Sequence, residues 1–442
     1  MKPDIGVTRI FILNGTDTMI EIKPHRITHA HIRVPGSKSY THRTLIAAAL
    51  ADGTSTVRAP LRSQDTLLTL AALAKLGAGV DDRESEIVIQ GQNGRFKPCA
   101  QEIYLANSGT SMRLLAGVAA LGEGLYTLTG TPRMYHRPIG HLLEALNQLG
   151  IAARALENNG CPPVAVPGGQ AVGGRVDINC SVSSQFLSAL LLMAPCTRDG
   201  MSITVSHGPV SRPYVDMTVD ILNRFGITVA RDGYTRFDVA GGQTYRAGDY
   251  TVEPDASQAG YFWGAAAITG GSVTVGGVST ASSQGDVRLA GVFERMGCRV
   301  EHVPEGITVT GGPLKAVTVD MADMPDMVPT LAVVAAFAQG TTVIENVAHL
   351  KAKESDRLTA TCSELKKMGI DAVAEADGLR VTGGSPRGAV IETYDDHRMA
   401  MSFAMAGLKV PGVKIKDPGC VEKSFPDFWQ VWERLSASGG AS

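Results

Sequence analysis

The segment Gly36-Ser37-Lys38-Ser39-Tyr40-Thr41-His42-Arg43 lies between a short alternating segment, residues 31–34, and an apolar run, residues 45–50. The pattern predicts a strand, a tight polar turn and a helix that begins near Ser37. Cations are unfavourable in the first helical turn, whose free amides already carry positive potential, so Lys38 and Arg43 indicate a bound anion. A Ser-capped surface helix is the alternative for this segment alone. A P-loop is excluded, because its glycine spacing is absent.

The same strand-turn-helix pattern recurs along the chain. Five predicted helices end at glycines about 72 residues apart: Gly77, Gly150, Gly226, Gly297 and Gly369. An apolar strand is predicted after each of these glycines. Polar turns before apolar helices begin near six residues at compatible spacing: Gly36, Asn107, Ser181, Glu253, Met324 and Tyr394. This periodicity predicts six β-α-β-α-β-β repeats. One helix of each repeat is apolar nearly all round and is therefore expected to be buried, with a sheet outside it.

Six repeats in an α/β chain of 442 residues predict two domains of three repeats each. The sixth repeat runs out before its closing strands, and the apolar segments 10–13 and 19–22 can supply them. We therefore expect a central domain over residues 37–250. The other domain is discontinuous, with residues 1–36 and 251–442. The connections near residues 36 and 250 are expected to form a hinge.

Composition restricts the class of protein. Hydrophobic residues make up 44% and charged residues 19%, and the formal net charge is -2. These values are typical of a globular protein without affinity for nucleic acid or an anionic membrane. No segment approaches 18 consecutive apolar residues, so no membrane helix is predicted. The seven cysteines are scattered without a Cys-x-x-Cys pair, which indicates neither disulfides nor a metal site and favours the cytoplasm.

Cationic side chains gather at equivalent points of the repeats. They lie in the turns at the buried helices or in the loops after the second strands: Lys38, Arg43, Arg113, Arg137, Lys353, Arg357, Arg398 and Lys423. Such a group would be self-repulsive without a ligand of several negative charges, so we expect a polyanionic ligand in a cleft between the domains. Asp326 and Glu354 lie in the same register and could transfer protons. The alternatives are a helix N-cap for Asp326 and a salt-bridged surface residue for Glu354.

Several motifs resemble the 5-enolpyruvylshikimate-3-phosphate synthase family. They are Val34-Pro35-Gly36-Ser37-Lys38-Ser39, Asn107-Ser108-Gly109-Thr110-Ser111-Met112-Arg113, Arg137-Pro138-Ile139-Gly140-His141-Leu142, Lys353-Glu354-Ser355-Asp356-Arg357-Leu358, Asp395-Asp396-His397-Arg398-Met399-Ala400 and Lys423-Ser424-Phe425-Pro426-Asp427. The resemblance implies an inside-out α/β barrel in two domains. It also implies transfer of the carboxyvinyl group of phosphoenolpyruvate to the 5-hydroxyl of shikimate 3-phosphate by addition and elimination, without a cofactor or metal, in a cytoplasmic monomer.

The resemblance also implies roles for individual residues. Phosphoenolpyruvate would contact Lys38, Gly109, Arg137, Gln185, Arg357, Arg398 and Lys423. Shikimate 3-phosphate would contact Ser39, Arg43, Ser183, Ser184, Ser211 and Lys353, with Gln185 and Tyr214 on the ring and Asn107 and His349 also in substrate contact. His349 stands where family members carry Asn. Lys38, Asp326, Glu354 and Lys423 would be catalytic: Asp326 takes the hydroxyl proton, and either Glu354 or Lys423 protonates the methylene carbon. Gly109 implies sensitivity to glyphosate, because the tolerant class carries Ala there.

Two other functions fit parts of the pattern. The related UDP-N-acetylglucosamine enolpyruvyl transferases carry Lys-Asn where this chain has Lys38-Ser39, and a reactive Cys in the loop that here spans residues 129–137 and contains none. A non-catalytic repeat scaffold would carry interchangeable turns. The six turns here differ in chemistry, which favours an enzyme.

Overall fold

The computed structural model describes residues 8–13, 17–169 and 171–437. Contacts within the chain divide it into two units, Met1–Pro35 with Pro254–Ser442, and Gly36–Glu253. The second connection therefore lies three residues beyond the expected position at 250. The Ser37 amide donates to the Glu253 carbonyl (2.8 Å) in one unit, and the Asp255 amide donates to the Pro35 carbonyl (2.9 Å) in the other.

The Gly36–Glu253 unit contains three four-stranded sheets, of orders β15-β4-β6-β5, β7-β8-β10-β9 and β11-β12-β14-β13. Its strands are β4 (Thr54–Arg58), β5 (Gly79–Asp82), β6 (Glu86–Gln90), β7 (Ile103–Tyr104), β8 (Leu125–Thr129), β9 (Arg154–Ala155), β10 (Val164–Pro167), β11 (Gly174–Asn179), β12 (Met201–His207), β13 (Ala230–Asp232), β14 (Arg236–Val239) and β15 (Asp249–Thr251). Its helices are α1 (Lys38–Leu50), α2 (Gln64–Lys75), α3 (Gly109–Ala119), α4 (Gly140–Gln148), α5 (Gln185–Met193) and α6 (Pro213–Arg224), with 3-10 turns η1 (Met134–His136) and η2 (Ala194–Cys196).

The other unit also contains three four-stranded sheets, of orders β1-β2-β24-β23, β17-β18-β16-β3 and β19-β20-β22-β21. Its strands are β1 (Thr8–Leu13), β2 (Asp17–Ile22), β3 (His29–Arg33), β16 (Ser272–Gly276), β17 (Arg299–Val303), β18 (Gly306–Thr310), β19 (Thr318–Asp320), β20 (Thr341–Glu345), β21 (Asp371–Ala374), β22 (Leu379–Thr382), β23 (Val390–Ile391) and β24 (Val413–Lys416). Its helices are α7 (Ala256–Thr269), α8 (Leu289–Arg295), α9 (Val328–Ala335), α10 (Arg357–Lys367), α11 (His397–Gly407) and α12 (Phe428–Ala437). Its 3-10 turns are η3 (Gly285–Arg288), η4 (Pro325–Met327), η5 (Ala348–Ala352) and η6 (Pro418–Lys423).

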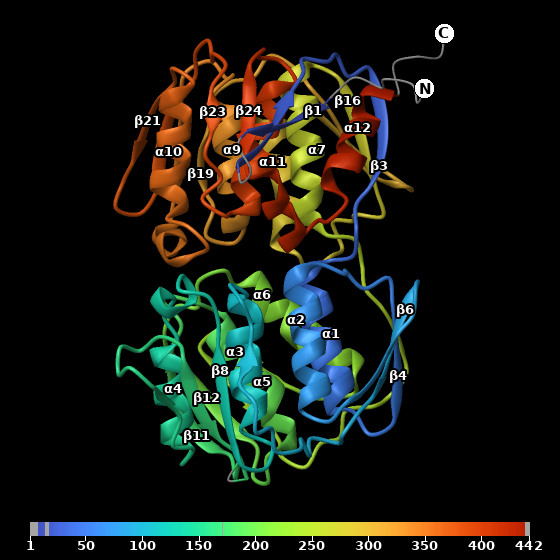
Figure 1. Ribbon diagram of the computed structural model, residues 1–442, viewed down its shortest axis with the longest axis vertical. Coiled ribbons are helices and arrows are strands. Elements are labelled where there is room, and N and C mark those ends of the chain that lie inside the picture. Colours follow the sequence, from blue (N-terminus) through green and yellow to red (C-terminus); the bar gives the residue numbers. More distant parts are fainter. Residues whose placement is uncertain (1–7, 14–16, 170, 438–442) are drawn as a thin grey trace. The chain divides into compact units, whose positions relative to one another are not determined.

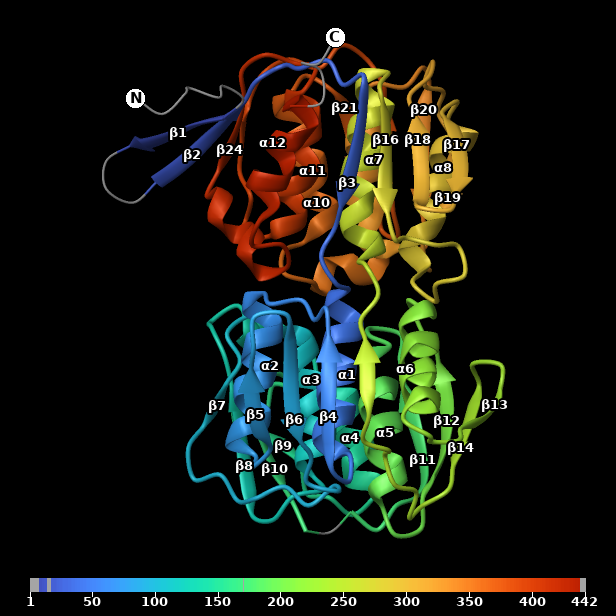
Figure 2. The same cartoon turned by 90° about the vertical axis from the view of Figure 1, so that its right-hand side faces the viewer.

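All six sheets share one pairing pattern: one edge pair is parallel and the remaining pairs are antiparallel. In four sheets the parallel pair flanks a buried helix in the sequence, as β7, α3 and β8 do. In the other two the first strand is exchanged. β3 leads into α1 but pairs with β16, and β15 leads into α7 but pairs with β4 (Figure 2). The exchange follows from the two connections, because the chain changes unit directly after each of these strands.

The strands β1 and β2 complete the sheet of β23 and β24. β2 pairs antiparallel with β24, from Met19 opposite Lys416 to Ile22 opposite Val413. The prediction that N-terminal strands supply this pairing is confirmed. Ile20 and Ile22 are buried there, so the alternation of the segment places its apolar side chains on the core face.

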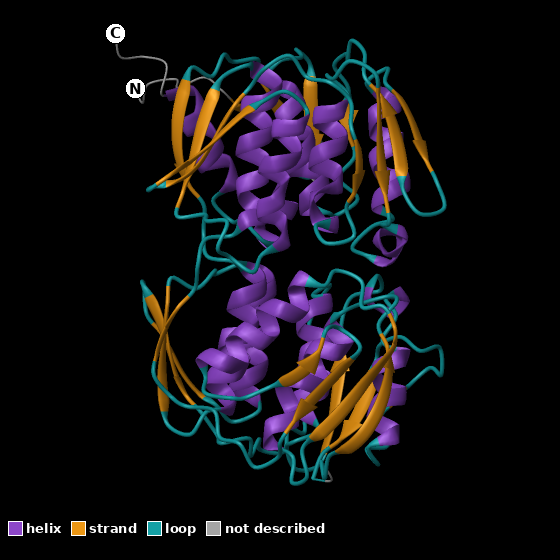
Figure 3. Ribbon diagram, turned by 180° about the vertical axis from the view of Figure 1, so that it is seen from behind, coloured by secondary structure: helices purple, strands orange, loops and turns teal. Residues whose placement is uncertain are grey.

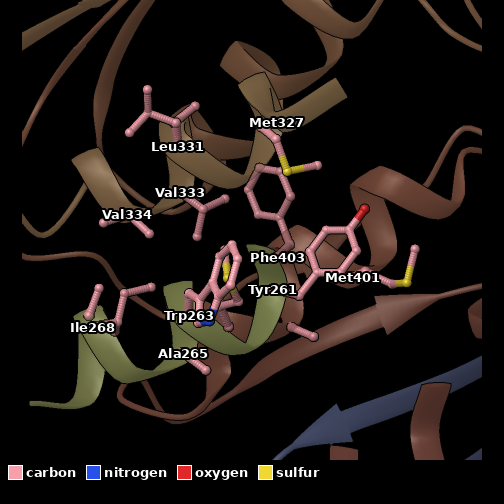
Figure 4. Close-up of a cluster of buried hydrophobic side chains, with 14 of the residues drawn as sticks. Tyr261, Trp263, Ala265, Ile268, Met327, Leu331, Val333, Val334, Met401 and Phe403 are labelled. Atoms are coloured by element: carbon pink, nitrogen blue, oxygen red, sulfur yellow. The ribbon is translucent and has the colours of Figure 1, made fainter. Parts of the chain in front are cut away.

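The apolar helices form the core of each unit. Nearly every residue of α1, α3, α5, α7, α9 and α11 is buried, as the sequence predicted. The helices α7, α9 and α11 contact one another (Figure 1), and strands run along the outside of the packed helices (Figure 3). Tyr261 and Trp263 of α7, Leu331 of α9 and Phe403 of α11 lie in one hydrophobic cluster (Figure 4). Rigid buried helices hold the polar residues at their N-termini in fixed positions.

Within the described residues, no helix is long and apolar enough to cross a membrane. All seven cysteines lie in the described part of the chain and carry free thiols.

Candidate active site

Polar side chains cap the N-termini of several buried helices. Ser108 accepts a hydrogen bond from the Ser111 amide at α3, Asp255 from the Ser257 and Gln258 amides at α7, and Asp396 from the Arg398 amide at α11. At α5, the cap residue Ser184 makes no such bond. The caps of α3 and α11 orient first turns that carry the predicted site residues Gly109 and Arg398.

Lys38 is the first residue of α1 and pairs with a carboxylate that the sequence analysis missed. Its Nζ lies 3.2 Å from Oδ2 of Asp65, near the start of α2, and the Asp65 side chain is only 3% exposed. The carboxylate offsets the repulsion between Lys38 and the helix N-terminus. An acidic residue in the first turn of the neighbouring helix was the available sequence signal.

Arg43, one turn further along α1, is a buried cation held by neutral groups. Its Nε donates to Thr218 (2.7 Å), Nη1 to the Ser39 carbonyl (3.0 Å), and Nη2 to Ser188 (3.3 Å) and the Tyr214 carbonyl (3.0 Å). Burial lowers the pKa of this guanidinium to about 10. None of these hydrogen bonds involves a carboxylate, so the site favours an added anion. Ser39 and Tyr214, both predicted site residues, therefore hold Arg43 through their backbone carbonyls.

Arg137 lies over the N-terminus of α3. Its Nη1 donates to the Asn107 carbonyl (2.8 Å) and to Asn107 Oδ1 (3.1 Å), and its side chain is buried. A Cβ added at Gly109 would lie 2.5 Å from Nη2 of Arg137. The missing side chain therefore gives room to a guanidinium, which together with the helix N-terminus makes an anion site.

Gln185 begins α5 and is oriented by α3. Its Oε1 accepts from Nη1 of Arg113 (2.8 Å), and its Nε2 donates to Thr110 (2.9 Å). Ser183 and Ser184 precede it, and the Ser183 hydroxyl accepts from the Gln185 amide (3.2 Å). Ser211, three residues before Tyr214, adopts a left-handed backbone (φ 55°) and is buried. The structure brings Arg113 and Thr110 to Gln185 as supporting residues.

In the other unit, Arg357 is surrounded by carboxylates. Its Nη1 donates to Asp326 Oδ1 (2.9 Å), Nη2 to Glu354 Oε2 (2.9 Å), and Nε to Asp396 Oδ2 (2.8 Å), and its side chain is 1% exposed. Glu354 is therefore a buried ion-pair partner, not a surface residue. Asp396 was not among the predicted site residues, although it lies two residues before Arg398.

Asp326 is the meeting point of the cations in this unit. Its Oδ2 accepts from Nη2 of Arg398 (2.7 Å), and Nζ of Lys353 lies 3.7 Å from Oδ1. It lies in η4 and does not cap α9, whose N-cap is Met327, so the N-cap alternative is wrong. Burial raises the pKa of Asp326, but Arg398, Lys353 and Arg357 outweigh burial and hold that pKa well below its usual range.

The turn before α11, which ends with the N-cap Asp396, is held against α10. Tyr394 and Asp395 both adopt left-handed conformations (φ 56° and 52°). The Tyr394 hydroxyl donates to Oε1 of Glu364 (2.7 Å), a fully buried carboxylate on α10 that also accepts from the Glu392 amide (3.0 Å). Because α10 begins with Arg357, one helix positions both arginines.

His349 and Lys423 complete the predicted set. His349 lies in η5 and is 9% exposed; burial, aided by Lys353, lowers its pKa to about 3. His349 is therefore neutral near pH 7 and can donate one hydrogen bond. Lys423 ends η6 and is 6% exposed. Burial raises the pKa of Asp395, and Lys423 partly opposes that rise.

The expectation that the cations need a ligand for charge balance is wrong for part of the set. Lys38, Arg357 and Arg398 pair with carboxylates of their own unit, so those charges are already compensated. Asp65 and Asp396, which are not among the predicted site residues, supply part of this compensation. No cluster of His, Cys, Asp or Glu within the described ranges is suited to a metal ion.

The chain is similar to known proteins in sequence and in structure. The family described as EPSP synthase (3-phosphoshikimate 1-carboxyvinyltransferase) matches residues 22–432. The chain is 44% identical to the 3-phosphoshikimate 1-carboxyvinyltransferase of Syntrophobacter fumaroxidans over 94% of this chain and 99% of the relative. It is 43% identical to the chloroplastic enzyme of that name from Arabidopsis thaliana, over 94% of this chain and 84% of the relative. A solved EPSP synthase from Acinetobacter baumannii is similar with a TM-score of 0.79 and 30% identity, covering 95% of this chain and 98% of that one.

Proposed function

Because the chain belongs to the EPSP synthase family, we propose that it transfers the carboxyvinyl group of phosphoenolpyruvate to the 5-hydroxyl of shikimate 3-phosphate and releases phosphate. The observation that carries this proposal is the pair Arg357 and Arg398. Both guanidiniums are buried, and both contact the same carboxylate, at 2.9 and 2.7 Å. Paired guanidiniums bind carboxylates, and phosphoenolpyruvate presents a carboxylate beside its phosphate.

Phosphoenolpyruvate is bound at both of its anionic groups. Arg357 and Arg398 hold the carboxylate, and Lys423 also contacts phosphoenolpyruvate. Lys38, Arg137 and the Gly109 amide hold the phosphate, and Gln185 packs beside it. This assignment is supported by the position of Arg137 over the α3 N-terminus, where a helix dipole adds to its charge.

Shikimate 3-phosphate is bound through Arg43 and a group of hydroxyls. Arg43 holds the carboxylate side together with Ser39, while Ser183, Ser184, Ser211 and Lys353 hold the phosphate. Tyr214 packs on the ring, and Asn107 and His349 make further contacts. The support for Arg43 is its burial among neutral acceptors, which leaves a positive charge to be balanced.

The reaction requires one proton to leave the hydroxyl and one to reach carbon. Asp326 takes the proton of the 5-hydroxyl while the hydroxyl oxygen forms a bond to C2 of phosphoenolpyruvate. Glu354 or Lys423 protonates C3. Loss of a C3 proton and of phosphate then restores the double bond. Lys38 balances the charge on the leaving phosphate.

The architecture is part of the proposal. We take the two units as domains of three β-α-β-α-β-β repeats each in an inside-out α/β barrel, with a hinge at the two connections. The shared strand order of the six sheets supports the repeats. We also propose a cytoplasmic monomer; sedimentation velocity tests the oligomeric state.

The test is the release of phosphate from phosphoenolpyruvate with shikimate 3-phosphate as acceptor. We expect release that depends on the acceptor and is lost in Arg398→Gln. Release with UDP-N-acetylglucosamine as acceptor would favour the related transferase. Binding of both substrates without release would favour a scaffold.

A further inference from the structure

The carboxylate of Asp326 fills a fork made by two fixed guanidiniums. Oδ1 lies 2.9 Å from Nη1 of Arg357, and Oδ2 lies 2.7 Å from Nη2 of Arg398. Other groups hold the arginines in place: Asp396 accepts from Nε of Arg357 (2.8 Å), and Nη1 of Arg398 lies 3.2 Å from the Tyr261 hydroxyl. Each arginine of the fork therefore has a side-chain contact besides the one with Asp326.

We propose that Asp326 is an internal stand-in for the carboxylate of phosphoenolpyruvate: in the ligand-free protein it occupies guanidinium donors that the substrate takes over, and substrate binding releases it to act as the base. The inference rests on the proposed function, which assigns Arg357 and Arg398 to that carboxylate. The proposal adds that Asp326, which leaves the fork when the substrate binds, is the residue that then takes the hydroxyl proton.

The charges explain why the release matters. A carboxylate held by two guanidiniums and a nearby lysine has a pKa well below its usual range, which makes it a weak base. When the substrate carboxylate binds the fork, its charge offsets that of the arginines. Burial, which acts in the opposite direction, then dominates and raises the pKa of Asp326. Substrate binding and basicity are thus linked, and the linkage is reciprocal.

Glu354 is a second carboxylate on Arg357, so Glu354→Gln controls for the loss of one negative charge in Asp326→Asn. It contacts Nη2 of Arg357 at 2.9 Å, and its side chain is 9% exposed. Glu354 therefore contacts a different nitrogen of Arg357 from the Nη1 atom that binds Asp326. Removal of the Glu354 charge makes the surroundings more positive without vacating the position that Asp326 occupies.

The experiment compares two ligands by titration calorimetry in the absence of shikimate 3-phosphate. Phosphoenolpyruvate carries the carboxylate, and vinyl phosphate is the same molecule without it. In Asp326→Asn we expect phosphoenolpyruvate to bind more tightly by about 5- to 150-fold, the usual range for coupled sites. Vinyl phosphate should gain far less. Glu354→Gln should increase the affinity for both ligands to a similar, smaller extent.

An equal gain for both ligands in Asp326→Asn would overturn the proposal, because it would reflect a general change in charge. Unchanged or weaker phosphoenolpyruvate binding would overturn it as well. Asp326→Ser repeats the measurement if the Asn variant does not fold. Arg398→Gln separates the two inferences. If it binds phosphoenolpyruvate like the parent while the parent still releases phosphate, the carboxylate assignment and the stand-in fail but the reaction stands.

Discussion

A Cβ added at Gly109 would lie 2.5 Å from Nη2 and 2.7 Å from Cζ of Arg137. The family resemblance places phosphoenolpyruvate in contact with Gly109. In the structure the nearest atoms belong to the guanidinium that we assign to the phosphate of that substrate. A substitution at Gly109 therefore acts on the anion site through Arg137.

We expect Gly109→Ala to displace Arg137 and to weaken glyphosate binding more than phosphoenolpyruvate binding. The strain from the added methyl group, roughly 1 to 3 kcal/mol, sets the size of the effect. The parent should be inhibited by glyphosate in competition with phosphoenolpyruvate. The measurement is the ratio of the inhibition constant to KM in Gly109→Ala, Arg137→Lys and the double variant. Additive effects of the two substitutions would show that Gly109 acts independently of Arg137.

Asp326→Asn should lower kcat by about 10²- to 10⁴-fold, because an amide of the same shape cannot accept the hydroxyl proton. A coupled phosphate-release assay measures the loss, and the melting temperature checks the fold. Turnover within a few-fold of the parent would leave Asp326 as an ion-pair partner only.

Tyr394→Phe should raise KM for phosphoenolpyruvate more than it lowers kcat. It removes the hydrogen bond from the Tyr394 hydroxyl to Glu364 (2.7 Å), which holds the turn that leads to Asp396 and to Arg398 in the first turn of α11. Steady-state kinetics give the two effects separately. Tyr126→Phe is the control, because that hydroxyl donates to the Lys97 and Glu123 carbonyls in the other unit. If both variants lose stability and neither changes KM, the Tyr394 bond has no role in positioning.

His349→Asn should make the stability of the protein less sensitive to acid. The folded-state pKa of His349 is about 3, below the ordinary value of about 6.5. Below about pH 6.5 the unfolded chain binds a proton at this histidine that the folded protein does not bind. The free energy of unfolding of the parent therefore decreases as the pH is lowered, by up to about 1.4 kcal/mol per pH unit. Denaturant midpoints at pH 7 and pH 5 measure the difference. His207→Asn, at an exposed histidine, is the control and should match the parent.

Asp286→Asn should stabilise the protein at neutral pH. Asp286 in η3 is buried, its Oδ1 lacks a hydrogen bond, and burial with the nearby Asp326 charge raises its pKa to about 7. The folded state thus favours the protonated acid, and parent stability falls as the pH rises from about 4 to 7. The melting temperature of the variant should exceed that of the parent at pH 8 and match it near pH 4. A constant difference across that range would contradict the assignment.

The local structural pattern and the family could be predicted from the amino-acid sequence. Buried helices, their polar N-terminal turns and the glycines that end the outer helices follow from local periodicity and backbone preference, because each depends on residues close in the chain. Gly77, Gly150, Gly226, Gly297 and Gly369 all adopt positive φ, as a helix C-terminal glycine does. The addition of β1 and β2 to the sheet of β23 and β24 could also be predicted, because the sixth repeat lacks its closing strands and needs other strands to pair with.

The pairing of distant strands and of distant charges could not be predicted from the sequence and is visible only in the folded chain. The exchange of β3 and β15 depends on pairing with β16 and β4, far along the chain, and the strands' own residues do not specify their partners. The pairing of Lys38 with Asp65, and of Arg398 with Asp326 72 residues earlier, depends on packed helices in the same way. Arg43 and Arg357 have the same formal charge, yet one is buried among hydroxyls and carbonyls and the other among carboxylates. Desolvation and neighbouring charge decide how such groups behave, and both are properties of the folded surroundings.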